Sequence, residues 1–263
     1  MEPAWETRRE LSSQSHEVNR KDLRARMISA GREMKEKLAH FFVKKVYADH
    51  NSSRSVRLTL ESLIAGLPAD GLGLNIGAGR TRFDGHIKNL ELKPGEGIDY
   101  VGSVERIPVG DAHFDLVIAQ EVLEHVEHPT RAAREIFRVL NSGGLAYVQL
   151  PFIIGYHPCP NDYWRFTHEG ILGLMKSAGF EIVQTGVTVG PATGFYRIAV
   201  EFVSVAASVV SRRLYKPAKF LSAASLYPMK LLDPIMLRSS EANRICGGYF
   251  LVCRKPCQAR GIL

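Results

Sequence analysis

Cysteine is scarce in this chain of 263 residues, and its arrangement excludes two classes of protein. The four cysteines, Cys159, Cys246, Cys253 and Cys257, are too few for the disulfide framework of a small secreted domain. No C-x-x-C pair occurs among them, so their spacing does not predict a structural zinc site. We therefore expect no bound metal.

Long hydrophobic runs are also missing. Residues 1–31 are polar and charged and contain no apolar segment of a secretory signal, which predicts a cytoplasmic location. The most apolar helical segment, 197–213, is shorter than the about 20 residues that span a bilayer. There is no P-loop, nucleophile elbow or nucleic-acid-binding module, and we expect no nucleic acid as a partner.

Charge is unevenly distributed along the chain. The net charge of +7 divides into +5 for residues 1–60, −6 for residues 61–194 and +8 for residues 195–263. An acidic middle is thus flanked by basic ends. Two explanations of this charge distribution remain open. The basic ends either are solvent-exposed helix faces or contact an anionic partner such as a lipid headgroup.

Short apolar segments alternate with helical segments from residue 72 onward. This pattern is typical of an α/β fold with a mostly parallel sheet, whose ligands lie at the carboxyl ends of the strands. Thr167 is expected to cap its helix, and the glycines of "NSGG" (141–144) are expected to end the preceding helix in a left-handed conformation. The expected strands are 72–76, 86–92, 97–103, 114–119, 145–151, 180–189 and 247–255, and the expected helices are 17–48, 55–65, 129–140 and 167–179.

Four parts are expected along the chain. Residues 1–66 form a helical N-terminal cap, and residues 67–190 form the α/β core. Residues 191–245 form a helical insertion, and residues 246–263 contribute the last core strand and a tail.

A glycine loop follows the first expected strand, in "LNIGAGRT" (74–81). Small residues at a strand end let the backbone approach a cofactor closely. The dinucleotide fingerprint G-x-G-x-x-G fails because position 82 is Arg, and only residues 80–85 separate the loop from the next strand. A helical crossover needs about a dozen residues. The loop therefore favours a ligand without a pyrophosphate.

Three motifs in this order and spacing resemble the class I S-adenosylmethionine-dependent methyltransferases, in particular their type-11 branch. They are "LNIGAG" (74–79), "FDLVIAQEVLEHV" (114–126) and "RVLNSGGLAYVQLP" (138–151). The resemblance covers about residues 72–189, and "GGYFLVCRKP" (247–256) is similar to the family's last strand. It implies a Rossmann-like, seven-stranded, mostly parallel sheet with an antiparallel last strand, and S-adenosylmethionine as the cofactor.

The resemblance also implies a set of cofactor-binding positions. Gly77 and Gly79 would lie against the methionine part, Glu91 would bind the ribose hydroxyls and Ile107 would lie near the adenine. Departures occur at Asn75 and Ser103, where the family usually has acids, and at Thr81, where a third glycine is common. Asn and Ser still form hydrogen bonds. The cofactor-binding residues expected are Asn75, Gly77, Gly79, Glu91, Ser103, Ile107, Gln120 and Glu121.

The loop "PFIIGYHPCPNDYWRFT" (151–167) follows the fifth expected strand, and its prolines exclude a regular helix. His157 and Asp162 are the expected catalytic residues, with His157 as a base for a hydroxyl and Asp162 orienting it or acting as the base itself. Tyr156, Tyr163, Trp164 and Arg165 are the expected substrate-binding residues. Alternatively, Tyr163, Trp164 and Phe166 are core anchors and Arg165 pairs with an acid. His125 suits structure or chemistry, and Cys159 is expected to be a packing residue.

The insertion contains an apolar helix at 197–213 with a narrow polar stripe, followed by the basic residues Arg212, Arg213, Lys216 and Lys219. It is expected to be either a buried cap or dimer helix, or an interfacial helix on an anionic membrane surface. The second alternative would make the protein peripheral to the inner face of the membrane, and basic N-terminal helices would form the other wall of a channel for a lipid-linked substrate.

The predicted function is S-adenosylmethionine-dependent methyl transfer to an oxygen of a small molecule, glycan or lipid-linked intermediate. The motif associated with amine acceptors is absent. The departures at Asn75, Thr81 and Ser103 leave a second alternative. In it, a degenerate, non-catalytic methyltransferase fold acts through a partner or a membrane surface.

Overall fold

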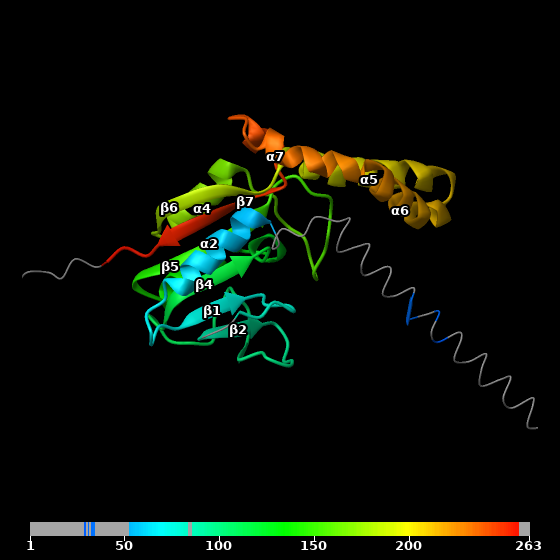
Figure 1. Ribbon diagram of the computed structural model, residues 1–263. Helices are drawn as coiled ribbons and strands as arrows, with labels where there is room; N and C mark the ends of the chain where they lie inside the picture. Colours follow the sequence, from blue (N-terminus) through cyan, green and yellow to red (C-terminus); the bar gives the residue numbers. More distant parts are fainter. Residues whose placement is uncertain (1–28, 30, 32, 35–52, 84–85, 258–263) are drawn as a thin grey trace, which may run out of the picture. The chain divides into compact units, whose positions relative to one another are not determined.

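The computed structural model describes residues 29, 31, 33, 34, 53–83 and 86–257. The described residues from 53 to 257 belong to one compact unit, which contains the sheet (Figure 1). Most of the expected N-terminal cap and of helix 17–48 lies outside the described residues. Residues 29, 31, 33 and 34 are helical and exposed.

The sheet has seven strands in the order β3-β2-β1-β4-β5-β7-β6. Neighbouring strands are parallel except where β7 pairs, since β7 runs antiparallel to both β5 and β6. This order and the single reversed strand confirm the predicted fold class. The strands are β1 (Gly73–Ile76), β2 (Ile87–Glu91), β3 (Tyr100–Val101), β4 (Phe114–Gln120), β5 (Leu140–Pro151), β6 (Glu181–Val189) and β7 (Gly248–Arg254).

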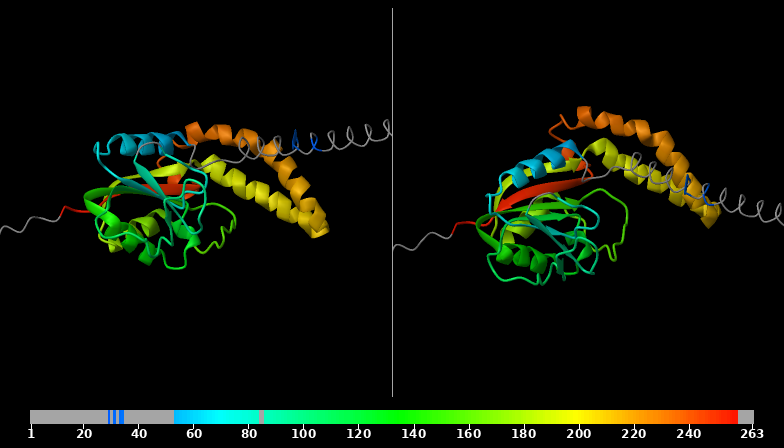
Figure 2. Two further views of the ribbon diagram at one scale, coloured as in Figure 1. Left: turned by 90° about the horizontal axis from the view of Figure 1, so that it is seen from below. Right: turned by 60° about the horizontal axis from the view of Figure 1, so that its bottom comes forward.

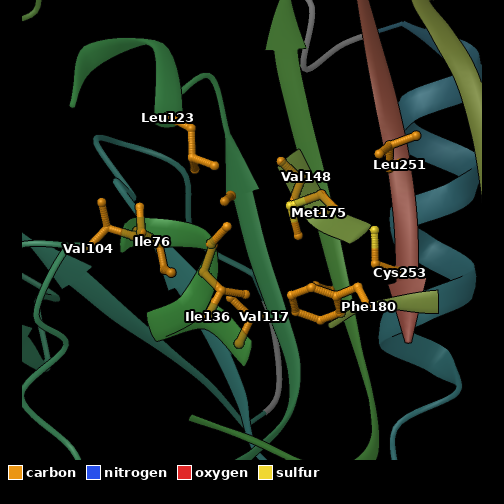
Figure 3. Close-up of a cluster of buried hydrophobic side chains, with 14 of the residues drawn as sticks. Ile76, Val104, Val117, Leu123, Ile136, Val148, Met175, Phe180, Leu251 and Cys253 are labelled. Atoms are coloured by element: carbon orange, nitrogen blue, oxygen red, sulfur yellow. The ribbon is translucent and has the colours of Figure 1, made fainter. Parts of the chain in front are cut away.

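Helices cover both faces of the sheet. Helix α2 (Arg54–Ala65) begins at the capping hydroxyl of Ser53 and buries Val56 and Leu60 against the strands. Helices α3 (Pro129–Val139) and α4 (His168–Ser177) contribute to the larger apolar cluster, in which Ile136 and Met175 are fully buried (Figure 3). All four residues of β1 are buried, as expected for a central strand of a parallel sheet.

The sequence predicted the strands and α4 correctly, but it misplaced some of the boundaries between helices and strands. Thr167 caps α4 as expected, by accepting a hydrogen bond from the Gly170 backbone nitrogen at 3.1 Å. The expected glycine cap of α3 is wrong, because Leu140 after the helix is already extended and begins β5. Gly143 has a φ of +81° and lies within that strand. No helix connects β1 to β2 among the residues described between them, in agreement with the short crossover.

Six helical segments separate β6 from β7, namely three α-helices and three 3-10 helices. Helix α5 (Pro191–Val210) runs beside α6 (Tyr215–Leu226), joined by η3 (Arg212–Leu214), as Figures 1 and 2 show. The tyrosine hydroxyl of Tyr196 donates to the Ala223 carbonyl at 3.0 Å, and Lys219 pairs with Glu201 at 2.8 Å. The remaining segments are η4 (Tyr227–Leu232), α7 (Asp233–Met236) and η5 (Ala242–Arg244).

Helix α5 is longer than the sequence indicated, because it begins at Pro191 rather than at residue 197. Asp233 fixes this first turn by accepting hydrogen bonds from the Ala192 and Thr193 backbone nitrogens at 2.8 and 3.3 Å. The prediction that this segment is too short to span a bilayer is therefore wrong, because the helix has 20 residues. Among the described helices, α5 is long and apolar enough to cross a membrane, with a mean hydropathy of 1.4.

Candidate active site

A pocket of 210 Å³ lies at the carboxyl ends of β1, β2 and β4, where an α/β sheet binds its ligands. Its walls come from the glycine loop, the end of β2, the segment after β3, the segment after β4 and the loop that follows β5. The lining residues are Ile76, Gly77, Gly79, Leu90, Glu91, Leu92, Gly102, Ser103, Val104, Glu121, Val122, His125, Val126, Cys159 and Pro160.

The glycine loop forms the floor of this pocket. Gly77 and Gly79 have φ angles of +61° and +51°, which side chains with a Cβ rarely adopt. The Gly77 backbone nitrogen donates to the Leu90 carbonyl at 3.0 Å, which fixes the loop to the end of β2. A Cβ on Gly77 would lie 2.6 Å from a methyl carbon of Val122. Glycine at position 77 is thus required by both the backbone and the space.

Glu91 stands at the end of β2 and belongs to the same wall. Its Oε1 accepts a hydrogen bond from the Gly79 backbone nitrogen at 2.6 Å, and its Oε2 accepts one from the Leu92 backbone nitrogen at 3.2 Å. The carboxylate thereby joins the glycine loop to β2. Carboxylate oxygens have spare acceptor capacity beyond these two bonds. The geometry accordingly leaves Glu91 able to accept from hydroxyl groups of a ligand.

Two more expected cofactor residues lie on the pocket. Ser103 lines it while its hydroxyl accepts from the Glu105 backbone nitrogen at 3.1 Å. Glu121 lines it with a φ of +55° and accepts a hydrogen bond from the Gln149 side chain at 3.1 Å. The left-handed backbone turns the chain sharply after β4. It carries the Glu121 side chain to the pocket.

The other three expected cofactor residues do not line this pocket. Asn75 is buried in β1, where its amide donates to the Asn89 side chain at 3.1 Å and to the Thr81 carbonyl at 3.3 Å. It supports the glycine loop from below. Ile107 is buried and borders a separate hollow, and Gln120 lies 3.5 Å from the Gln149 side-chain oxygen. Their cofactor roles remain predictions.

The loop 152–166 is held against the segment after β4 by its backbone. The backbone nitrogens of Tyr163 and Trp164 both donate to the Glu124 carbonyl, at 2.8 and 3.2 Å, and the Trp164 indole donates to the Val126 carbonyl at 2.9 Å. Tyr156, Tyr163 and Trp164 expose 78%, 48% and 43% of their surface. These rings are therefore not core anchors, whereas Phe166 packs on the core.

Asp162 and Arg165 form a two-pronged ion pair inside this loop. The guanidinium reaches Oδ1 of Asp162 at 2.5 Å and Oδ2 at 2.6 Å, and it also donates to the Gly155 carbonyl at 3.0 Å. Because Arg165 donates to it, the pKa of Asp162 falls to about 2. This arrangement fits the alternative in which Arg165 pairs with an acid, and it makes Asp162 a poor base.

His157 lies beside this pair. The Asp162 Oδ2 accepts its backbone N–H at 2.8 Å and lies 3.5 Å from its Nδ1. Burial lowers the pKa of His157, so its imidazole is neutral near pH 7. The ring packs edge-on against His125, with 5.3 Å between the ring centroids. His157 thus contacts His125, which lines the pocket, but His157 is not itself one of the lining residues.

Glu124 is a residue that the sequence reasoning missed. It belongs to the 3-10 turn η2 (Leu123–His125) and is fully buried. Neither carboxyl oxygen has a hydrogen-bond partner among the described residues. Burial, and next the charge of Glu121, raise the pKa of Glu124 to about 9. The signal in the sequence was the spacing E-x-x-E-H directly after β4, since it puts two acids and a histidine in one short turn.

Comparisons with known proteins find similarity to methyltransferases. Residues 78–148 match a family model described as "Methyltransferase domain", type 11. A probable S-adenosylmethionine-dependent methyltransferase of Mycolicibacterium smegmatis is 31% identical over 90 residues, which are 32% of this chain and 35% of that protein. The chain therefore spans about a third of this relative's length.

A longer alignment covers 61% of this chain and 73% of the ubiquinone biosynthesis O-methyltransferase of Methylocella silvestris, at 28% identity over 188 residues. Among solved structures, a phosphoethanolamine N-methyltransferase 2 of Haemonchus contortus has a TM-score of 0.49 and 14% identity, covering 83% of this chain and 57% of that one. The family model thus matches residues 78–148, and the order of the strands agrees with the class I methyltransferase fold, so this part of the chain is similar to the S-adenosylmethionine-dependent methyltransferases of type 11.

Proposed function

We propose that this chain uses S-adenosylmethionine to methylate a hydroxyl oxygen of an apolar acceptor at a membrane surface. The observation that carries the proposal is the pocket at the carboxyl ends of β1, β2 and β4, in which Glu91 and the glycine loop meet. The relative that makes ubiquinone methylates oxygen, and its match supports an oxygen acceptor here.

The residues present fit the cofactor. Gly77 and Gly79 leave the backbone uncovered, and Glu91 offers acceptors to two vicinal hydroxyls. Gly79 and Glu91 also border a neighbouring open hollow of 710 Å³, so the space around Glu91 extends beyond the 210 Å³ pocket. The carboxylate of Glu121 on the same wall suits a cationic sulfonium. Glu91 and Glu121 thus supply negative charge at the pocket, although positions 75 and 103 lack the family's usual acids.

When bound, S-adenosylmethionine supplies an activated methyl group on a positively charged sulfur. The chain's residues then have to hold the acceptor oxygen in line with that methyl group and accept the hydroxyl proton. The neutral imidazole of His157 is the form that accepts a proton. Asp162 stays ionised and orients the loop by its bonds to Arg165 and to the His157 backbone. Tyr163 and Trp164 present half-exposed rings for an apolar acceptor.

Titration calorimetry with S-adenosylmethionine and S-adenosylhomocysteine tests the cofactor site. We expect micromolar binding of both, weakened about 10- to 100-fold in Glu91→Gln, since a hydrogen bond to a charged group contributes about 1.5–3 kcal/mol. Glutamine keeps one oxygen for the Gly79 nitrogen but replaces the other acceptor by a donor. The change thus removes one acceptor for the ribose hydroxyls and for the Leu92 backbone nitrogen, while the contact with the Gly79 nitrogen is kept.

Glu96→Gln is the matched control, because it makes the same change in net charge at an exposed position of the neighbouring hollow. Its affinity is expected to equal that of the unaltered chain. An absence of binding up to millimolar cofactor would refute the enzymatic proposal. The alternative of a non-catalytic methyltransferase fold that acts through a partner or membrane would then stand.

The membrane part of the proposal rests on the end of the α5–α6 hairpin far from the sheet. Phe202, Val209 and Val210 expose 72%, 84% and 81% of their surface, and Phe220 and Leu221 on α6 expose 52% and 63%. Monomeric soluble proteins rarely expose large contiguous apolar patches without a partner. These side chains define the apolar tip.

Basic residues adjoin the apolar tip and indicate which partner covers it. Arg212, Arg213 and Lys216 lie exposed at the turn between α5 and α6. Apolar and cationic side chains side by side match the acyl and headgroup layers of an anionic membrane. The first half of α5 buries Tyr196 and Val200 within the protein, so this arrangement favours lying on the membrane over crossing it.

Vesicle flotation measures this binding. The full chain is expected to float with vesicles that contain phosphatidylglycerol and to stay down with pure phosphatidylcholine. Replacing Arg212 and Arg213 together by Gln is expected to weaken binding about 30-fold, because each basic residue near an anionic surface contributes about 1 kcal/mol. Phe202→Ser should weaken binding as well, whereas Leu58→Ser, at an exposed apolar site on α2, should not. Equal binding by all variants, or none by the unaltered chain, would contradict membrane docking.

A further inference from the structure

The side chains of Glu124, His125 and His157 converge in a group that the proposed function leaves only partly used. Glu124 and His125 come from η2 after β4, and His157 comes from the loop after β5. One ligand-type atom from each residue lies within 4.8 Å of the other two. The set is two imidazoles and one carboxylate, which is a common ligand set for divalent transition metals.

The distances are too long for hydrogen bonds and suit an ion between the groups. Glu124 Oε1 lies 3.6 Å from His125 Nε2 and 4.0 Å from His157 Nε2. A tetrahedral ion with bonds of about 2.1 Å places its ligands about 3.4 Å apart. The two measured separations exceed that value by a few tenths of an ångström, which rotation of a side chain can supply.

Both imidazoles are held in the tautomer that a metal ligand needs. The Nδ1–H of His125 donates to the Asn161 carbonyl at 2.6 Å, which leaves a lone pair on its Nε2. The Nδ1 of His157 lies 3.0 Å from the Gly155 carbonyl. Metal-binding histidines commonly donate their other ring N–H to a backbone carbonyl or carboxylate.

One contact of His157 has to be reconciled with this tautomer. Arg165 Nη2 also lies 3.0 Å from His157 Nδ1, which would make that nitrogen an acceptor. Nη2 carries two hydrogens, and Asp162 at 2.6 Å and the Gly155 carbonyl at 3.0 Å take both of them. His157 Nδ1 therefore keeps its own proton for Gly155, and its Nε2 lone pair faces Glu124.

A second, independent observation is the carboxyl group of Glu124. The side chain is fully buried, and neither oxygen has a hydrogen-bond partner among the described residues. Burying an unpartnered carboxyl group costs several kcal/mol unless it is paired or coordinates a metal. An ion between the carboxylate and the two imidazoles would satisfy it.

We propose that Glu124, His125 and His157 bind one divalent ion of the zinc class, with an open coordination position toward the pocket. Imidazole nitrogens favour Zn²⁺, Co²⁺, Fe²⁺ and Ni²⁺ over Mg²⁺, which prefers oxygen ligands. Of the three ligands, His125 lines the 210 Å³ pocket, and this contact is why the open position is assigned to the pocket side. The expectation of no metal rested on cysteine spacing, and these ligands are of another type.

The role of this ion rests on the proposed methyl transfer, although its binding does not. A coordinated acceptor hydroxyl releases its proton to solvent, because a bound cation lowers the pKa of an oxygen ligand. The oxygen then forms the new bond to the methyl carbon as the sulfur–carbon bond breaks. The bonding pair stays on sulfur, which becomes a neutral thioether, and the metal is neither oxidised nor reduced. With the ion bound, His157 is a ligand, and solvent takes its place as the proton acceptor that the proposed function assigns to it.

Metal content and affinity test the site directly. The full-length, tag-free chain is stripped with a chelator and titrated with Zn²⁺ against a competing indicator and with Co²⁺ followed by its visible absorption. We expect one ion per chain, and at least a 10-fold loss of affinity in Glu124→Gln and in His157→Gln. Loss of an outer partner of a metal ligand alone costs about 10- to 100-fold. His128→Gln, an exposed histidine in the same segment, should bind as the unaltered chain does.

Circular dichroism and cofactor titration on the same samples separate the outcomes. His157 is one-third exposed, so its variant is expected to fold even if Glu124→Gln does not. Less than about a tenth of an ion per chain, or equal affinity in all variants, would overturn the metal site. If cofactor binding persists in that case, the proposed function stands and only the metal fails. Metal binding without cofactor binding would refute the function and leave the metal site intact.

Discussion

Arg165→Ala is expected to destabilise the folded chain by about 3 kcal/mol, because it leaves the carboxylate of Asp162 buried without its cation. The Asp162 side chain is 1% exposed, and both of its oxygens accept from the Arg165 guanidinium. Removing one partner of a buried pair costs about 3–5 kcal/mol. The value here falls at the low end because the arginine itself is about a quarter exposed. Urea denaturation followed by circular dichroism measures the change.

Two comparisons identify the ion pair as the cause. Arg134→Ala, which removes an exposed arginine from α3, is expected to change stability by less than about 0.5 kcal/mol. The double variant Asp162→Asn with Arg165→Gln has no unpaired buried charge and should recover part of the loss. A loss of 3 kcal/mol in that double variant as well would contradict the argument from charge.

The same pair predicts how stability depends on pH. The folded pKa of Asp162, about 2, lies below its ordinary value of 3.8, so the pair contributes stability above about pH 4. That contribution is lost as the pH falls toward 2, and it amounts to about 2 kcal/mol. Chains with Asp162→Asn should lack this part of the acid transition.

The sheet could be predicted from the sequence because its signals are local. Four consecutive buried residues in β1 and a glycine loop after them identify a central parallel strand without any knowledge of the neighbours. Thr167 caps α4 with its own hydroxyl, which is again a contact within four residues. The seven-stranded, mostly parallel sheet with an antiparallel last strand followed from the resemblance, and the pairing of the strands confirms it.

The candidate site was less predictable because its pairings join distant segments. Asp162 looked like a base in the sequence, and only the folded loop shows that Arg165 holds it as an anion. Glu124 attracted no attention, since the loop that packs on its turn through Tyr163 and Trp164 lies 38 to 40 residues further along the chain. The start of α5 was also missed, because Asp233 caps its first turn from across the insertion.

Gly77→Ala is expected to weaken S-adenosylmethionine binding at least 30-fold and to lower the melting temperature, for two separable reasons. Its φ of +61° costs a residue with a Cβ about 1–2 kcal/mol. The added methyl group would also lie 2.6 Å from Cγ2 of Val122, so the glycine loop or Val122 must move. Since Gly77 and Val122 both line the pocket, either movement changes the surface that meets the cofactor. Calorimetric titration and a thermal melt measure the two effects.

A series of glycine variants separates the two causes of the lower melting temperature, namely the strained backbone and the close contact with Val122. Gly79→Ala meets the left-handed φ of +51° with nothing within 4 Å of the new Cβ, so it reports backbone strain alone. Gly110→Ala has neither a strained φ nor a close neighbour and should melt as the unaltered chain does. The double variant Gly77→Ala with Val122→Ala removes the close contact but keeps the backbone strain. The loss of stability from Val122→Ala to this double variant should therefore equal the loss from the unaltered chain to Gly79→Ala. Equal melting temperatures for Gly77→Ala and Gly110→Ala would mean that the loop does not hold the conformation that the cofactor site requires.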